Sequence, residues 1–350
     1  MNSENQNNSP LKGCYSILVI TVEWMLMGFS HGNNDYLTYK IMYEAVNNLG
    51  INQYSGLEIG QRALYRVGGI LGFTYDQFLS IYVLIALLVL WIGLGYLTNN
   101  RGLALTLYFI FPFIYDATQI RNFFALCLMV YAFHFLINKG FFKSVLPFVI
   151  CVIMAGLIHS IAFFYLIFLL TKIKNIKTLI LITIFLSFLI GLFFNFFKSI
   201  SYTLVANKIS IYSSLGTTPF VYMILYAILF FLNIFIMYFT YNMSLKDNDL
   251  KLQKIALKGY QASILLITCY PLVIIDEVFF RIFRDFFIIT YAIVVLIAGK
   301  AYRKFPADSA FIFILTFFYA AINSYVWLFA GGKYSGLVIP IFTNNSIFGR

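Results

Sequence analysis

The sequence predicts an all-α polytopic integral membrane protein with about eleven transmembrane helices in one membrane domain, residues 1–350. The chain is 61% hydrophobic and only 11% charged, and its mean hydropathy is +0.87. Soluble domains average about 25% charged residues, whereas a helix that crosses a bilayer needs roughly 20 apolar residues. Apolar runs such as 181–197 and 220–239 are continuous. They lack the alternation over segments of about ten residues that is typical of a β-barrel.

The helices follow from the apolar runs and the polar turns between them. We expect them at about 13–30, 78–97, 103–115, 120–137, 144–157, 160–173, 178–197, 220–241, 259–275, 286–299 and 309–330. The runs 103–115 and 144–157 are short, so a tilted or broken helix is expected there. No small-residue cleavage site follows the first run, which indicates a retained helix rather than a signal peptide.

Lysine and arginine separate into alternating sets of loops. Twelve of the 16 lysines fall in one set, with Arg101 and Arg303, and six of the eight arginines fall in the other. Because lysine-rich loops mark the cytoplasmic face, the N-terminus is expected inside and the C-terminus outside. The long loop 31–77 is then on the outer side. The loop 242–258 is cytoplasmic, and its mixed charges are typical of a solvated segment.

Several functional classes fit the composition poorly. The net charge is +11, but the lysines are scattered over short loops, which follows the positive-inside rule better than it fits nucleic-acid binding. The four cysteines lie in or beside apolar runs and form no Cys-x-x-Cys pair. The charged segments of the outer side contain no Asp-x-Asp pair and no His/Cys ligand spacing. We therefore expect no disulfide framework, no metal and no cofactor.

Four outer-side segments carry ionisable side chains. In the first, Glu58, Arg62 and Arg66 are spaced four apart, so on a helix they share one face. A salt-bridge ladder on an interfacial helix is the simpler interpretation. In the second, Arg121 begins a helix, against the helix dipole. Near the membrane interface it needs a partner or a route to water. An anion site is the favoured interpretation, and a structural pair with Asp116 is the alternative.

In the third segment, His159 and Ser160 are the only strongly polar residues between two apolar helices. A hydrogen-bonded interfacial histidine is the simpler interpretation. The fourth segment holds five charges within ten residues: Asp276, Glu277, Arg281, Arg284 and Asp285. Three of them, at 277, 281 and 284, have helical spacing, although local pairing explains the segment as well.

The four segments together are more informative than any one of them. All are assigned to the same side, and arginine is preferred over lysine there. The planar guanidinium group matches phosphate and carboxylate oxygens in a bidentate manner. The acids and the histidine beside these arginines are candidates for a general base. The sequence therefore predicts a lipid-linked phosphate or diphosphate bound at the outer leaflet.

Four ordered motifs resemble the EpsG family of Wzy-type exopolysaccharide and capsule polymerases. They are GNNDYLTY (32–39), GLEIGQRALYRV (56–67), QIRNFFALCLMVYAFHFL (119–136) and LIHSIAFFYLIFLL (157–170). Carried over by position, the family-like functional residues are Asp35, Tyr39, Glu58, Arg121 and His159. The chain departs from the family pattern at His31, where an arginine is common nearby, and by an extra asparagine before Asp35.

The resemblance implies a metal-independent, GT-C-like glycosyltransferase in the bacterial plasma membrane. It would join undecaprenyl-diphosphate-linked repeat units of a capsule, O-antigen or exopolysaccharide at the outer face. Its expected partners are that lipid-linked glycan, membrane lipids and a chain-length regulator. Our hypothesis places Arg121, Arg281 and Arg284 on the diphosphate, with Arg62 and Arg66 in reserve. Asp35, Glu58 or His159 is the base, and Tyr39 contributes to substrate binding.

Two other functions remain open from the sequence. An O-antigen ligase or another GT-C transferase shares the diphosphate chemistry but usually carries a large late outer loop, and the late outer loops here are short. A flippase or transporter of lipid-linked glycan would show charges at mid-membrane and internal repeats. This chain has its charges at helix ends and no detectable repeat. A glycan polymerase is therefore the first hypothesis.

Overall fold

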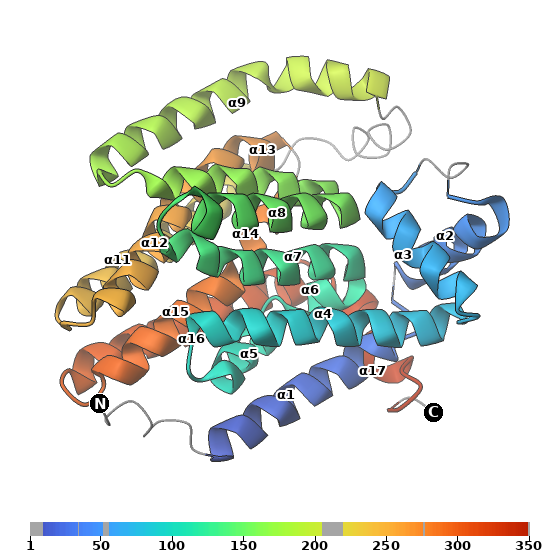
Figure 1. Cartoon of the computed structure of the whole chain (residues 1–350), viewed down its shortest axis with the longest axis horizontal. Coiled ribbons are helices and arrows are strands. Elements are labelled where there is room, and N and C mark those ends of the chain that lie inside the picture. The colour runs from blue at the N-terminus through green and yellow to red at the C-terminus, as the bar shows by residue number, and fades with distance from the viewer. Residues whose placement is uncertain (1–9, 34, 52–55, 205–219, 276, 349–350) are drawn as a thin grey trace.

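The structure is a computed structural model that describes residues 10–33, 35–51, 56–204, 220–275 and 277–348. Within these ranges the chain is helical, and the only strand-like pairing is an isolated bridge between Ser30 and Asn345. The helices lie side by side, with their ends gathered at two opposite ends of the molecule (Figure 1). The prediction of an all-α polytopic membrane protein is confirmed.

The described residues contain nine stretches that are long and apolar enough to cross a membrane. The first four are Leu11–Gly28 in α1 (Pro10–Gly28), Tyr75–Leu97 (α4), Ile120–Ile137 with α7 (Ile120–Phe133) and Phe141–Ile158 with α8 (Leu146–Ile158). The next two are Ile176–Phe193 in α9 (Ile176–Leu204) and Phe220–Leu245 (α11). The last three are Leu250–Ile274 with α12 (Leu250–Leu265) and α13 (Tyr270–Ile275), Glu277–Ala301 with α14 (Phe280–Arg284) and α15 (Phe287–Ala301), and Pro306–Ala330 with α16 (Pro306–Ser324). Most residues of the stretch 277–301 are buried, and it forms the centre of the bundle. By contrast, only 11% of the residues of 176–193 are buried, and this helix lies at the edge.

The predicted helix 103–115 is broken in the structure. Its residues form α5 (Arg101–Ile110) and the start of the short α6 (Phe113–Thr118). Pro112 lies between them, and proline interrupts a helix because it lacks an N–H donor and its ring clashes with the carbonyl one turn earlier. Of the two forms considered for this short run, tilted or broken, the structure shows the broken one.

The predicted transmembrane α-helix 160–173 is also different in the structure. Residues Ser160–Lys172 form a 3₁₀-helix of 13 residues, called η3 here. A 3₁₀-helix rises about 2.0 Å per residue, so this segment is about 26 Å long. That length nearly matches the roughly 30 Å hydrocarbon core. The tighter winding lets a short segment reach almost as far as the longer α-helices beside it.

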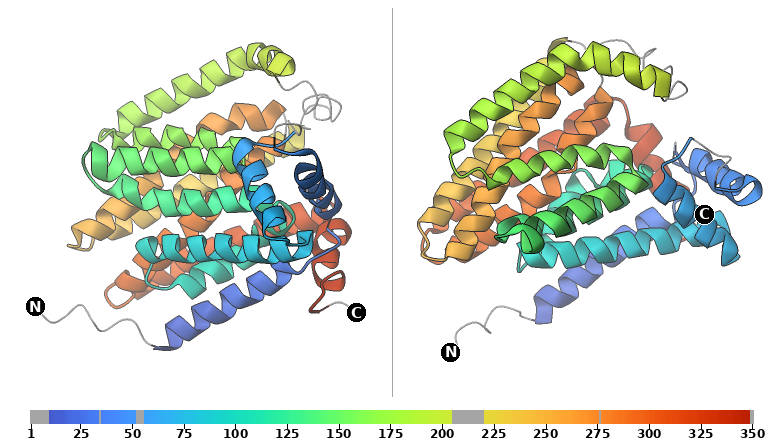
Figure 2. Two further views of the ribbon diagram at one scale, coloured as in Figure 1. Left: turned by 45° about the vertical axis from the view of Figure 1, so that its right-hand side comes forward. Right: turned by 45° about the horizontal axis from the view of Figure 1, so that its top comes forward.

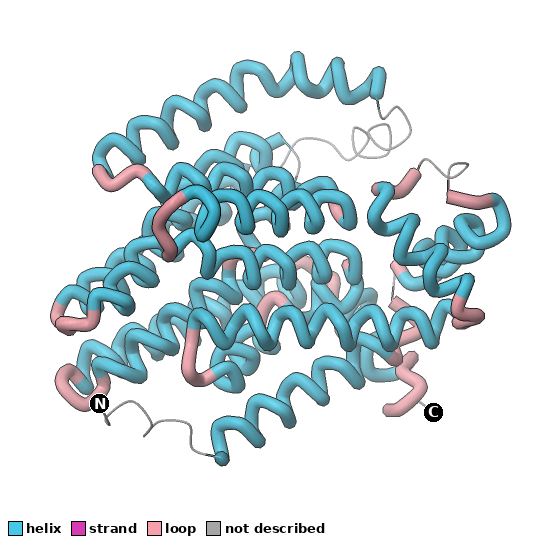
Figure 3. The backbone as a smooth tube through the Cα atoms, viewed as in Figure 1, coloured by secondary structure: helices cyan, strands magenta, loops and turns pink. Residues whose placement is uncertain are grey.

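The two loop sets predicted from the cations lie at opposite ends of the bundle. The turns that follow α4, α7, α11 and α15 lie at the left of Figure 1, and we call this the lysine-rich end. The helices α2 (Tyr36–Leu49), α3 (Ile59–Ile70) and α17 (Ile339–Thr343) lie at the right, which we call the arginine-rich end. Two rotated views keep this separation (Figure 2), and Figure 3 shows the connecting loops at each end.

The segment 31–77, expected as a long loop, contains two helices in the structure. Asn47 on α2 ties them together by donating to the backbone oxygen of Tyr65 on α3 at 3.2 Å. The start of α4 is fixed by a capping box, in which Thr74 accepts from the Gln77 N–H and the Gln77 side chain accepts from the Thr74 N–H. The segment 31–77 is therefore a folded cap on the arginine-rich end.

The segment 242–258, expected as a charged loop, is mostly helical. Helix α11 continues to Leu245, and α12 begins at Leu250. The Asp249 carboxylate caps α12 by accepting from the N–H groups of Lys251 and Leu252 at 2.8 and 3.3 Å. Only residues 246–249 connect the two helices. The charged residues of this segment were interpreted as a loop because an exposed helical turn is as polar as a loop.

One close backbone approach and one C-terminal contact help to hold the bundle together. Near the lysine-rich end, helix α4 packs closely on α7, because a Cβ atom on Gly93 would lie 2.8 Å from the backbone nitrogen of Tyr131. The C-terminal segment, which includes the short apolar helix 334–343, closes onto the end of α1. There the His31 N–H donates to the Asn344 oxygen at 2.8 Å.

Candidate active site

Glu58 is the centre of a charged cluster at the arginine-rich end. It is the N-cap residue of α3, but its side chain makes no capping hydrogen bond. Its Oε2 accepts from the Arg121 guanidinium at 2.8 Å, and its Oε1 accepts from the Ser160 hydroxyl and N–H at 3.0 and 3.3 Å. One carboxylate thus joins α3, α7 and the turn before η3. The Glu58 and Arg121 side chains are only 12% and 13% exposed.

A glycine brings Glu58 to these partners. A Cβ atom on Gly60 would lie 2.7 Å from the backbone oxygen of Leu157, at the end of α8. Only glycine permits that approach, and it places the start of α3 directly against the turn that carries His159 and Ser160. Any larger residue at 60 would push Glu58 away from this turn.

Arg121 lies in the first turn of α7 and faces two side chains of the segment 31–77, Glu58 and Tyr39. Besides its contact with Glu58, its guanidinium carbon lies 5.3 Å from the ring centre of Tyr39 on α2. Such a cation–π contact is strongest where water is excluded, and Tyr39 is buried. The Nε atom of Arg121 is buried without a hydrogen-bond partner among the described residues. Arg121 therefore keeps one donor for a ligand.

Asp35 is a further acid of this site, and its carboxylate accepts a hydrogen bond from Tyr39. It is the N-cap residue of α2 and makes no capping bond through its side chain. Burial raises the pKa of the Asp35 carboxyl, and the charges of Arg281 and Arg121 partly oppose that rise. Burial likewise raises the pKa of Tyr39 to about 12. Arg121 and Arg281, which come from different helices, are thus close enough for their positive charges to lower the pKa of Asp35.

His159 lies in the extended turn between α8 and η3. Its Nδ1 atom is 3.5 Å from Glu58 Oε1. Burial lowers the pKa of His159, and the positive charges of Arg121 and Arg281 lower it further, while Glu58 opposes them. The imidazole is therefore held in its neutral form at neutral pH. The predicted residues Asp35, Tyr39, Glu58, Arg121 and His159 thus lie in one cluster.

Arg284 belongs to a second, more deeply buried network. Its NH2 atom donates to Gln119 Oε1 at 2.8 Å and to Asp116 Oδ1 at 3.3 Å, and its Nε is 4.0 Å from Asp285 Oδ1. The alternative in which Asp116 pairs with Arg121 is therefore wrong, because Asp116 faces α14 and Arg121 faces α3. Burial raises the pKa of Asp116 to about 7 despite this pairing.

Asp285 completes this network. Its carboxylate accepts from the Asn122 amide at 2.9 and 3.1 Å and from the Tyr165 hydroxyl at 2.9 Å. Asp116 also accepts from the Tyr108 hydroxyl at 3.0 Å. The network joins α5, α6, α7, η3 and α14 through buried polar groups. We interpret it as the anchor that holds the arginine-rich end together.

A small cavity lies beside this network. It has a volume of about 130 Å³, and its charged lining residues are Arg281, Arg284, Lys333 and Glu277. Glu277 lies 3.6 Å from Lys333, which leaves a positive balance in the cavity. Arg281 also acts on the pKa values of both Asp35 and His159, so it lies between the cavity and the Glu58 cluster. Asp276 lies outside the described residues.

Arg62 and Arg66 are not brought into either group. Arg62 donates to the backbone oxygen of Ile51 at 2.5 Å, and Arg66 donates to that of Asn47 at 3.0 Å. Both therefore satisfy carbonyl groups at and just beyond the end of α2, a favourable place for cations. The predicted ladder of Glu58 with Arg62 is replaced by the long-range pair of Glu58 with Arg121.

Several site residues escaped the sequence analysis. Gln119, Asn122, Tyr108 and Tyr165 all bind the carboxylates or the guanidinium of the buried network. The one available signal was Gln119 and Asn122 flanking Arg121 within an apolar stretch. Within the described ranges, no group of three or more His, Cys, Asp and Glu side chains is arranged to hold a metal ion.

The fold and the charged cluster define a polytopic helical membrane protein with a buried acid–arginine–histidine site at one end of its bundle. The chain belongs to the EpsG family, whose sequence model matches residues 14–340, nearly its whole length. This is a family of exopolysaccharide polymerases of the Wzy type. No curated protein and no solved structure showed a significant match to the chain.

Proposed function

We propose that this protein joins undecaprenyl-diphosphate-linked oligosaccharide units into a surface polysaccharide by glycosyl transfer. Membership of the EpsG family over residues 14–340 carries the proposal. The meeting of Glu58, Arg121 and His159 at one end of the bundle supports it, because these groups come from three separate motifs. The metal-independent, GT-C-like character implied by the family resemblance is part of the proposal, as is a chain-length regulator as partner.

The proposed reaction needs a base and a cationic leaving-group site. A sugar hydroxyl of the acceptor attacks the anomeric carbon of the growing glycan and loses its proton to the base. A bond forms between that oxygen and the anomeric carbon, and the bond from this carbon to the diphosphate oxygen breaks. The lipid diphosphate leaves with the bonding electrons. Arginines preorganised in a poorly hydrated site stabilise the charge that develops on it.

We assign the base to Asp35 rather than to Glu58. Both Glu58 oxygens already accept hydrogen bonds, from Arg121 and Ser160, so Glu58 acts as a positioning residue. The Asp35 carboxylate makes no capping bond, and its raised pKa brings it closer to the pH at which proton transfer is efficient. Neutral His159 is the second candidate.

We assign the diphosphate to Arg121 and Arg281. Arg121 retains an unpaired Nε donor, and Arg281 lines the positive cavity. Arg284 supports them as an anchor, because its guanidinium already lies between two carboxylates. The arginine-rich end then faces outward and the lysine-rich end faces the cytoplasm, as the positive-inside rule favours. The location in the bacterial plasma membrane follows from the same proposal.

The rate of polymerisation is expected to fall as the pH is lowered through the pKa of Asp35, because a general base works only when deprotonated. Burial raises that pKa above its ordinary value of 3.8. The fall in rate on the acid side of the pH–rate profile, its acid limb, is therefore centred above pH 3.8. In reconstituted protein, Asp35→Asn should lower the rate by about 100-fold or more and remove the limb. His159→Gln should leave the limb in place. The opposite pattern would assign the base to His159.

Deleting the protein in its host tests the function itself. We expect the surface glycan to lose its long chains on a gel, while single repeat units are still exported and attached. Full-length polymer that is no longer attached to its final acceptor would indicate a ligase. Lipid-linked units that accumulate on the inner leaflet would indicate a flippase. Either result would overturn the polymerase proposal.

A further inference from the structure

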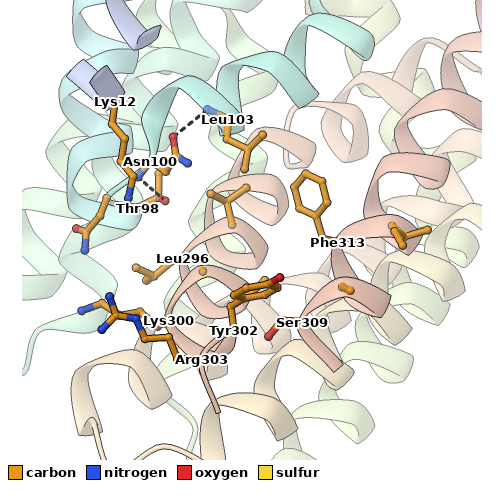
Figure 4. A pocket seen from close by; sticks show the side chains of 16 residues that line it. Lys12, Thr98, Asn100, Leu103, Leu296, Lys300, Tyr302, Arg303, Ser309 and Phe313 are labelled. Carbon is orange, nitrogen blue, oxygen red and sulfur yellow. Dashed lines mark hydrogen bonds between the residues drawn. The ribbon is translucent and has the colours of Figure 1, made fainter. Parts of the chain in front are cut away.

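A larger cavity lies at the lysine-rich end, far along the bundle from the candidate active site. Its volume is about 700 Å³. The start of α1, the turn before α5, the end of α15 and the first turns of α16 form its walls (Figure 4). None of the residues assigned to polymerisation lines it, so its role is separate from the proposed function.

One side of this cavity is cationic. Lys300 and Arg303 lie next to each other on this side in Figure 4, and Lys12 lies further along the same side, near Thr98 and Asn100. None of the lining residues, all in the described part of the chain, is acidic. The nearby Asp308 is engaged elsewhere, because its carboxylate accepts from Lys246 at 2.5 Å. The three cations therefore have no counter-charge within the cavity, which makes it suited to an anion.

The other side of the cavity is apolar and leads to the membrane-facing surface. Leu103 and Phe313 lie on this side (Figure 4). Ile314 also lines the cavity and is 52% exposed on α16, within a membrane-spanning stretch. An apolar chain can therefore extend from the cavity along α16 into the bilayer without crossing a polar surface.

A buried hydroxyl group supplies a polar contact inside the cavity. Ser309 is 2% exposed, lines the cavity, and its Oγ atom has no hydrogen-bond partner among the described residues. An unsatisfied buried polar group costs about 1–3 kcal/mol. A ligand oxygen that accepts a hydrogen bond from this hydroxyl removes that cost. Ser309 also lies near the N-terminus of α16, where the helix dipole favours an anion.

We propose that this cavity binds an anionic lipid, in which a phosphate ester carries long apolar chains. The phosphate group lies among Lys12, Lys300 and Arg303 and accepts a hydrogen bond from Ser309. The chains lie against Leu103 and Phe313 and leave along α16. Basic pockets between transmembrane helices bind lipid headgroups in this way. Diacyl phospholipids and isoprenyl monophosphates share this chemistry, and the assay below separates them.

The test measures lipid binding to the full-length protein in neutral detergent by native mass spectrometry and by the shift in Tm. The probes are phosphatidylglycerol, farnesyl phosphate, phosphatidylcholine and inorganic phosphate. The pocket variant combines Lys12→Gln, Lys300→Gln and Arg303→Gln. Its matched control combines Lys139→Gln, Lys143→Gln and Lys177→Gln, which removes the same charge from exposed positions outside the cavity. Ser309→Ala tests the hydroxyl group without disturbing an internal hydrogen bond.

We expect phosphatidylglycerol or farnesyl phosphate to bind and to raise Tm, and the stronger of the two identifies the natural source. The pocket variant should bind about 100-fold more weakly, on the order of fivefold for each cation. Ser309→Ala should bind about tenfold more weakly, and the control should bind like the wild type. The proposal is overturned if phosphatidylcholine or inorganic phosphate alone gives the same shift. Equal losses in the pocket variant and its control would overturn it as well.

Discussion

Replacing Arg121 with lysine is expected to abolish long polymer while the protein still folds and reaches the membrane. Lysine keeps the charge but loses the planar fork that contacts Glu58, lies against Tyr39 and offers a free Nε. Removing one preorganised donor of this kind costs on the order of 100-fold or more in rate. The measurements are glycan chain length on a gel and protein abundance in the membrane fraction.

Arg66→Lys is the matched control for this substitution. Arg66 lies at the same end but donates to the single backbone oxygen of Asn47, a contact that an ammonium group also makes. We expect its polymer to resemble that of the wild type. If Arg121→Lys and Arg66→Lys give the same polymer length and rate, Arg121 has only a structural role. A double-mutant cycle with Glu58→Gln then measures how strongly Glu58 positions Arg121.

Replacing Arg284 with alanine is expected to destabilise the fold strongly. The substitution leaves Asp116 and Asp285 buried beside each other without their guanidinium partner. Removing one partner of a buried ion pair costs about 3–5 kcal/mol. The measurements are Tm and the monodisperse fraction of the purified protein in detergent. Burial raises the pKa of Asp116 to about 7 even though Arg284 opposes the rise. The loss of Arg284 should raise this pKa further, so protonation should relieve part of the cost already as the pH falls towards 7.

Arg281→Ala separates this structural effect from catalysis. Arg281 is only partly buried, and its Nε donates locally to the backbone oxygen of Val278 at 3.0 Å. We expect its loss to lower polymerisation far more than stability, whereas Arg284→Ala lowers stability first. The addition of Asp116→Asn to Arg284→Ala should restore part of Tm. If it does not, the buried charge is not the cause of the instability.

The all-α membrane fold class was readable from the sequence because its signals are local. A continuous apolar run predicts a helix wherever it occurs, and a lysine in a short loop carries its bias without knowledge of its neighbours. The exceptions are instructive. The break at Pro112 and the tight winding of η3 are backbone details within runs that looked uniform. In 242–258, the polar face of a helical turn resembled a loop.

The candidate residues were also found from the sequence, since charged groups at the ends of apolar helices stand out. Which of these residues form ion pairs with one another could not be found from the sequence. Arg121 lies five positions from Asp116 but pairs with Glu58, 63 positions away, and Arg284 pairs with Asp116 across 168 positions. Asn122 and Tyr165 resembled ordinary members of apolar helices until Asp285 was placed between them.

The sequence by itself determined that this chain is a helical membrane protein with its lysines at one end and its candidate chemistry at the other. This was possible because the polarity of each residue, taken along the chain, decides which segments can be buried in a bilayer. Only the tertiary structure decided that Glu58 holds Arg121 beside His159, and that Arg284 is anchored between two carboxylates. The same structure placed an anion-binding cavity at the lysine-rich end. Ion pairs in a low-dielectric interior depend on distances of a few ångströms, and those distances are set by how helices far apart in the chain pack together.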